Sequence, residues 1–242
     1  MPESEVPIRP AATVMLVRDT DDGPEVFMLR RTAKAVFASG MYVYPGGKVD
    51  EADGEGHDGY LVAAIRECYE EAGVLLVEEP DGALIGDGHP ALGHRVAVYD
   101  HSLSIHDLCD EHGLRLATDR MAYVAHWITP KGESPRRFDT RFFLAVAPPA
   151  QTSSHDDTET VASEWVRPAD ALTRGRAGEM GLMPPTVATL EFLAAHPSAE
   201  AALAAGRAIG EPPVILPKIR VGVDGAIAGI AMPGDEDYDL LD

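Results

Sequence analysis

Short apolar runs and turn residues alternate along the first fifty residues of the chain. The segments 12–18 and 25–30 are rich in apolar and β-branched residues, and the Asp, Gly and Pro residues of 19–24 are typical of a turn between them. We therefore expect two strands that form a hairpin. A third strand is predicted over 41–44, and the Pro-Gly-Gly sequence at 45–47 is expected to end it.

The spacing of apolar residues changes to a helical period over 59–72. Four apolar residues there recur at i, i+4, i+7 and i+11 and share one stripe of a helix: Leu61, Ile65, Cys68 and Ala72. Gly73 is placed to end the helix, because glycine readily adopts the left-handed conformation found at helix C-termini. The apolar segment 74–77 predicts another strand.

The rest of the chain mixes the two periods. Weak amphipathic spacing over 94–112 predicts helical structure, in two short helices if it is not continuous. Further elements are expected as strands at 121–128, 141–146 and 164–166, as helices at 168–174 and 185–195, and as short β-like pieces after residue 212. Because strands and helices do not alternate strictly, the pattern favours an α+β fold or a three-layer sandwich over a doubly wound sheet.

Composition adds a strong charge to this picture. The 242 residues are 45% hydrophobic, which is ordinary for a globular protein, but 40 Asp and Glu face 20 Lys and Arg. This acidity argues against a nucleic acid polymer or an anionic membrane as partner. The N-terminus lacks the pattern of a signal peptide, and no apolar run approaches the length of a membrane span, so a cytoplasmic location is expected. A small phosphate-bearing substrate remains compatible, since metal ions can supply positive charge.

Three carboxylates crowd the predicted helix. Glu67 and Glu71 are four residues apart and project from one side, with Glu70 beside them. Arg66 can reach Glu70, but one arginine does not neutralise three acids. A hard divalent cation such as Mg²⁺ or Mn²⁺ would, because it prefers oxygen ligands. The alternative interpretation of these residues alone is a solvated acidic helix face.

The run 47–74 resembles the Nudix box, G-x5-E-x7-R-E-U-x-E-E-x-G-U, where U is a bulky apolar residue. Six positions of the helical half match, with Cys68 at the first apolar position: Arg66, Glu67, Glu70, Glu71, Gly73 and Val74. The stretch from Gly47 to Arg66 is five residues longer than the pattern allows. Asp53 stands at the expected distance after Gly47, and Asp58 at the expected distance before Arg66, so the identity of the first acid stays open.

The resemblance implies a Nudix-type α/β/α sandwich with a mixed sheet. We expect a Nudix domain over 8–200, with a helical insertion at about 85–118 after the box helix, and a C-terminal extension over 201–242 that ends in an acidic tail. The long box loop and the insertion are similar to the branch of the family that includes peroxisomal coenzyme A diphosphatases. Weaker cues for that branch lie at 43–50, 127–130 and 137–143.

By this resemblance the protein is expected to be a metal-dependent pyrophosphohydrolase. Its substrate would be a nucleoside diphosphate linked to another group, with CoA or acyl-CoA as one candidate. Mg²⁺ or Mn²⁺ would be held by the three box glutamates and a carbonyl of Gly46, and Arg66 would orient a box carboxylate. A general base would come from the box or from a later loop, where Glu159 is favoured over Asp156 and Asp157. Family members are often dimers, so a homodimer is possible.

Arginines outside the box are candidates for holding the substrate. A local basic cluster includes Arg137 and Arg141, and Arg30 ends the second strand. The guanidinium fork suits phosphate, although ordinary ion pairing on two strands is an equal alternative. A non-catalytic Nudix-fold nucleotide sensor is the alternative function, which the three retained glutamates disfavour. No zinc site is expected, because the histidines of 89–112 do not share one helical face and no Cys-x-x-Cys is present.

Overall fold

The computed structural model describes residues 6–33, 38–132, 134–155, 160–223 and 225–241. Its main sheet has eight strands in the order β10-β7-β8-β1-β2-β3, with β4 beside β1 and β9 beside β2. These strands are β1 (Ile8–Thr20), β2 (Gly23–Arg31), β3 (Tyr42–Val43), β4 (Gly46–Lys48), β7 (Ala122–Ile128), β8 (Arg137–Val146), β9 (Thr160–Val166) and β10 (Val214–Ile215). Two small hairpins stand apart, β5 (Val77–Glu78) with β6 (Arg115–Leu116) and β11 (Lys218–Val221) with β12 (Ile227–Ala231).

Strand directions in the main sheet are mixed. β1 pairs antiparallel with β2 through the predicted hairpin and parallel with β8 along its other edge. Alternate residues of β1 enter two different cores: Val14 and Leu16 belong to one, Met15 and Val17 to the other. β1 is therefore apolar at nearly every central position, as expected of a strand covered on both faces.

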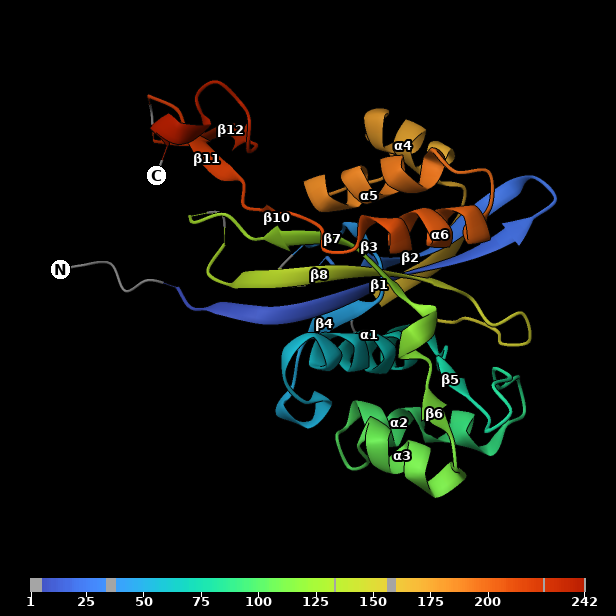
Figure 1. The fold of residues 1–242 in the computed structure, drawn as a ribbon. Helices are drawn as coiled ribbons and strands as arrows, with labels where there is room; N and C mark the ends of the chain where they lie inside the picture. The colour runs from blue at the N-terminus through green and yellow to red at the C-terminus, as the bar shows by residue number, and fades with distance from the viewer. Residues whose placement is uncertain (1–5, 34–37, 133, 156–159, 224, 242) are drawn as a thin grey trace.

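Helices cover both faces of the sheet (Figure 1). The α-helices of the described ranges are α1 (Gly56–Ala72), α2 (Arg95–Tyr99), α3 (Ile105–His112), α4 (Pro168–Arg176), α5 (Pro184–Ala194) and α6 (Ala199–Ile209). In Figure 1, α1 to α3 lie below the sheet and α4 to α6 above it, which confirms the predicted α/β/α sandwich and the helices expected within 94–112. No helix in the described ranges is both long and apolar enough to cross a membrane.

Sequence analysis did not identify α6. Its buried stripe is made of small residues apart from Leu203, so the apolar period is weakly marked in the sequence. Small residues allow this helix to lie close to the sheet: a Cβ on Gly206 would stand 2.6 Å from Val124 Cγ1. α6 runs through residue 201, where the C-terminal extension was expected to begin, and β10 beyond it pairs with β7.

The segment 42–48 lies where β1 and β2 separate. The two strands pair only near their hairpin, and beyond it β3 pairs with β2 while β4 pairs with β1. Since β8 and β9 occupy the outer edges of β1 and β2, β3 and β4 fill the space between them. The segment 42–48 thus places the glycines of β4 beside α1, which contacts β1 and β4.

Candidate functional site

The box helix α1 is packed on more than one side. Ile65, Cys68 and Ala72 are fully buried against the sheet, whereas Leu61 is only partly buried. Gly73 ends the helix in the left-handed conformation, with φ of 69°, and donates its N–H to the Tyr69 carbonyl. The acidic side is also enclosed, so the three glutamates do not form a solvated helix face: Glu70 and Glu71 are 6% and 5% exposed.

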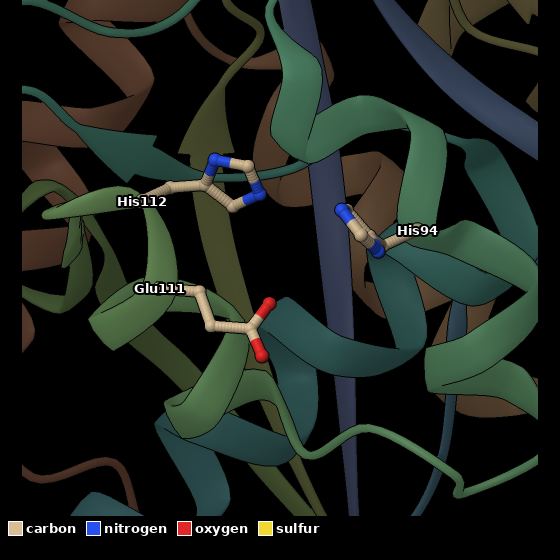
Figure 2. A group of neighbouring side chains, drawn as sticks. All are labelled: His94, Glu111 and His112. Atoms are coloured by element: carbon tan, nitrogen blue, oxygen red, sulfur yellow. The ribbon is translucent and has the colours of Figure 1, made fainter.

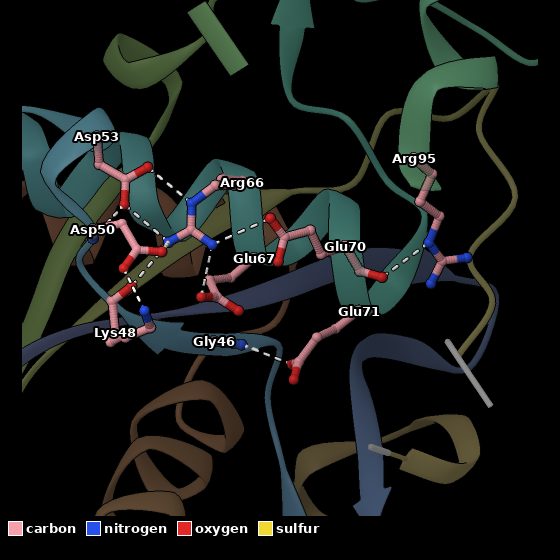
Figure 3. A network of polar contacts seen from close by, with 9 residues as sticks. All are labelled: Gly46, Lys48, Asp50, Asp53, Arg66, Glu67, Glu70, Glu71 and Arg95. Atoms are coloured by element: carbon pink, nitrogen blue, oxygen red, sulfur yellow. Dashed lines mark hydrogen bonds and ion pairs between the residues drawn. The ribbon is translucent and has the colours of Figure 1, made fainter. Parts of the chain in front are cut away.

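Arg66 organises the acidic side of the helix (Figure 3). Its Nε and Nη2 donate to the two carboxylate oxygens of Asp53 at 2.8 and 2.9 Å, and Nη2 also donates to the Lys48 carbonyl at 2.9 Å. Nη1 donates to Glu67 at 2.9 Å and to Glu70 at 3.2 Å. A guanidinium has five N–H donors, so every donor of this buried side chain has an acceptor.

Asp53, not Asp58, contacts the box arginine. Asp53 is 2% exposed and lies in the short 3-10 helix Glu51–Asp53, where it also accepts from the Asp50 backbone N–H at 2.8 Å. Asp58 lies in the first turn of α1 and is exposed. The extra residues therefore lie between Asp53 and Arg66, and they extend into the start of α1 because only Gly54 and Glu55 precede the helix. The acid that follows Gly47 at the family distance is the one that meets Arg66.

Burial sets the protonation of two box glutamates. Desolvation raises the pKa of Glu67 to about 7; the charge of Arg66 opposes this shift and that of Glu70 adds to it. Desolvation also raises the pKa of Glu70, against the attraction of Arg66. For Arg66 itself, burial lowers the pKa, but the Asp53 hydrogen bonds and the neighbouring carboxylates raise it well above its usual value. Negative charge in this cluster thus exceeds what one arginine balances.

The Pro-Gly-Gly segment, whose two glycines lie in β4, approaches these carboxylates closely. Gly46 N–H donates to Glu71 at 3.0 Å. A Cβ on Gly47 would lie 2.4 Å from a Glu67 carboxylate oxygen, and one on Gly46 would lie 2.5 Å from the Ala12 carbonyl oxygen, so neither position admits a side chain without movement. Glu67 and Glu70 turn toward Arg66 while Glu71 turns toward Gly46. Within the described part of the chain, the box glutamates are not among the groups of three whose ligand atoms all lie within 4.8 Å of one another.

A cleft of about 770 Å³ opens on this cluster. The three box glutamates and Arg66 line one part of the cleft. Residues 183–186, at the Pro-rich start of α5, line another part. Aromatic side chains of β7 and β8, Trp127, Phe138 and Phe142, form an apolar wall. Three further arginines also line the cleft: Arg9, Arg31 and Arg136. The space therefore combines an acidic end, cations and an apolar surface.

The arginines singled out from the sequence lie elsewhere. Arg137 is buried and donates to the Thr129 carbonyl at 3.0 Å, and Arg141 stacks over Tyr60 of α1 at 3.9 Å from the ring centroid. Neither lines the cleft. Side chains alternate between the two faces of β8, and the even-numbered residues of the strand, such as Phe138 and Phe142, face the cleft. Arg30 is exposed and also outside it, whereas the adjacent Arg31 and Arg136 line it.

The insertion after the box helix contributes residues that sequence analysis did not select. Tyr99 and His101 line the cleft, and His101 has a positive φ of 60°, which is uncommon for a residue with a side chain. Arg95 donates from Nε to the Glu70 backbone carbonyl at 2.9 Å. No periodic signal marks these contacts, since they depend on how the insertion folds back. Glu159, the predicted general base, lies outside the described residues.

Comparisons with known proteins find related sequences and a related fold. The family described as NUDT19 Nudix domain matches residues 55–193. Human acyl-coenzyme A diphosphatase NUDT19 is 30% identical over 192 residues, covering 74% of this chain and 50% of that protein, and the chicken protein is 26% identical over 278 residues, covering 88% and 72%. The crystal structure of a NUDIX hydrolase from Alicyclobacillus acidocaldarius superposes with a TM-score of 0.75 at 28% identity, covering 83% of this chain and 97% of that one.

The match to curated relatives is partial in length. The chain spans between 50% and 72% of the four curated relatives compared. The family match begins at residue 55, inside the box loop, so it includes the whole of α1 and the insertion.

Proposed function

The chain belongs to the Nudix hydrolase family, and from that premise we propose that it is a metal-dependent pyrophosphohydrolase acting on a nucleoside diphosphate linked to another group. The observation that carries the proposal is the enclosed acidic cluster at one end of the cleft. Three box glutamates are retained there, and Arg66 is fully engaged by its neighbours. A protein that only bound nucleotide would not need this excess of buried carboxylate.

The donor set fits a hard divalent cation. Glu67, Glu70 and Glu71 offer carboxylate oxygens, a carbonyl of Gly46 remains our proposed further ligand, and oxygen is the donor that Mg²⁺ and Mn²⁺ prefer. To share one ion, Glu67, Glu70 and Glu71 would have to turn toward a common point, because Glu67 and Glu70 now accept from Arg66 and Glu71 accepts from Gly46. When bound, such ions would neutralise charge on the diphosphate and lower the pKa of the attacking water.

The residues of the chain itself have distinct proposed roles. Arg66 orients Glu67 and Glu70 and is held in turn by Asp53. A buried carboxylate with a pKa near 7, as at Glu67, can exchange a proton near neutral pH. Glu159 remains our proposed general base from the later loop.

We propose CoA or acyl-CoA as the substrate class. The curated relatives named acyl-coenzyme A diphosphatase support this. The cleft also has what such a substrate needs, arginines for phosphate and an apolar wall of Trp127, Phe138 and Phe142 for a long, partly apolar group. Since Arg9, Arg31 and Arg136 line the cleft, we assign substrate contact to them before Arg30, Arg137 and Arg141.

A hydrolysis assay on purified protein tests the proposal. CoA, acyl-CoA and ADP-ribose are incubated with Mg²⁺ or Mn²⁺, and the phosphorylated products are separated by chromatography. We expect Glu70→Gln and Glu71→Gln to reduce turnover by at least about 100-fold, in the range reported for loss of a charge-stabilising group at a reaction centre. Asp58→Asn is the matched control, because Asp58 lies on the same helix but is exposed. Full activity of both glutamine variants would overturn the site, and tight nucleotide binding without turnover would favour the sensor.

A further inference from the structure

A second group of ligand-type side chains lies in the insertion, outside the cleft. His94 ends the 3-10 helix Pro90–His94, and Glu111 and His112 are the last two residues of α3. Figure 2 shows the two imidazole rings and the carboxylate converging on one space. One ligand atom from each lies within 4.8 Å of the others, and no other group in the described ranges meets this condition.

His112 supplies a second, independent observation. Its Nε2 is buried and has no hydrogen-bond partner among the described residues. A buried polar atom without a partner is destabilising, and a bound ligand at this nitrogen would remove that cost. The rings of His94 and His112 are 5.2 Å apart between centroids and tilted by 57°, which allows a nitrogen of each to face the same point.

A third histidine nearby, His89, is already engaged. The His89 ring lies 5.8 Å from that of His112, but its Nδ1 accepts from the Ala91 N–H at 3.2 Å and its Nε2 lies 3.3 Å from a Glu79 oxygen. Three protein donors therefore remain, two nitrogens and one carboxylate. Zinc accepts such a set with water in the fourth position.

The chemistry of this set differs from that of the box. Imidazole nitrogen suits zinc and other late transition metals, whereas Mg²⁺ requires oxygen and keeps much of its water. Ligand atoms around a tetrahedral zinc ion lie about 3.3 Å apart, given bonds of about 2.0 Å. Side-chain rotations that move each atom by about 1 Å bring the three donors to that spacing, and Glu111 is exposed and so has room to rotate.

We propose that His94, Glu111 and His112 bind one zinc-type divalent ion. The ion would join the 3-10 helix to the end of α3 and so fix the insertion. The insertion in turn contacts the box helix: Arg95 donates to the Glu70 carbonyl, and the Tyr69 hydroxyl donates to the Ala91 carbonyl at 2.9 Å. The role assigned to this ion is structural, and the proposal does not depend on the reaction at the box.

Zinc titration of the metal-free full chain tests the proposal. Isothermal titration calorimetry is performed in excess Mg²⁺, which competes for oxygen sites but not for imidazole. We expect one tight zinc equivalent, and a Co²⁺ complex whose visible absorption reports nitrogen ligands. Glu111→Gln and His94→Gln should each weaken binding by at least about 10–100-fold, the loss seen even when only a supporting residue of a metal site is removed.

Two controls separate this site from the box and from general histidine binding. His106→Gln changes an exposed histidine on the same helix and should leave zinc affinity unchanged. Glu70→Gln should also leave it unchanged. Zinc should raise the unfolding temperature of the parent protein and of both controls, but not that of Glu111→Gln. The proposal is wrong if no saturable zinc binding occurs in excess Mg²⁺, or if Glu111→Gln and His94→Gln both bind zinc like the parent.

Discussion

Glu67 is expected to destabilise the metal-free protein at neutral pH. Its pKa is raised from the ordinary 4.5 to about 7, chiefly by burial. Between these two values the folded protein retains a proton that the unfolded chain releases, so the free energy of unfolding falls as the pH rises through this window. Below about pH 4.5 both states hold the proton and the loss is absent. Above about pH 7 the loss is complete.

The size of the effect follows from the difference in pKa. One pKa unit corresponds to about 1.4 kcal/mol, so a rise from 4.5 to about 7 corresponds to about 3 kcal/mol at the most. Glu67→Gln removes the ionisable group while keeping an oxygen that can accept from Arg66, whose Nη1 lies 2.9 Å from Glu67. In the absence of divalent ions, we expect the variant to be more stable than the parent above about pH 7, by up to that amount, and to lose this advantage near pH 4.5.

Urea denaturation in a chelator, followed by fluorescence across this pH range, measures the difference. Asp58→Asn serves as the control on the same helix and should show no pH-dependent gain. Added Mg²⁺ should stabilise the parent more than Glu67→Gln, since an ion compensates the charge that glutamine lacks. The reasoning is refuted if the stability difference between Glu67→Gln and the parent does not change with pH, or if the variant is less stable throughout.

Two further predictions concern the arginines and their partners. Asp53→Asn should lower the free energy of unfolding by about 1–3 kcal/mol in urea denaturation, because the amide nitrogen cannot accept from Arg66 and leaves one buried donor without its acceptor. A change below about 0.5 kcal/mol, the level of a surface substitution, would contradict the assigned pairing. Arg136→Ala should raise KM for the diphosphate substrate with little change in stability, because Arg136 lines the cleft. Arg137→Ala should instead lower the melting temperature, because the Arg137 side chain is buried and donates to the Thr129 carbonyl. Steady-state kinetics and calorimetry on both variants check this pair, and the opposite pattern would return Arg137 to the substrate site.

The strands and the box helix could be predicted because their signals are local. The hairpin of β1 and β2 has turn residues between two apolar runs, and α1 has both a helical stripe and the glycine that ends it. The helix α6 also ends at a glycine, Gly210, but its buried stripe consists of small residues apart from Leu203, so no apolar pattern marked it in the sequence. Secondary structure is thus most visible where large side chains carry the packing.

Contacts between elements could not be derived in the same way. Asp53 and Asp58 were both candidates for the first acid of the box in the sequence. The path of the loop, which the sequence does not reveal, brings Asp53 to Arg66. Arg136 and Arg137 are adjacent in sequence, but a shift of one residue moves a side chain to the other face of a strand. The His94 group was not expected because its members were judged against one helical face, whereas they come from two elements.

The saturation of Arg66 has a consequence for the order of binding. All five of its donors are directed to groups of the protein itself, so its positive charge is already committed and cannot follow an incoming phosphate. A diphosphate that reached the acidic end alone would meet repulsion from Glu67 and Glu70. Under the proposed function, divalent ions would therefore enter before the substrate or together with it, as its metal complex, and the local supply of such ions would be a condition of substrate capture.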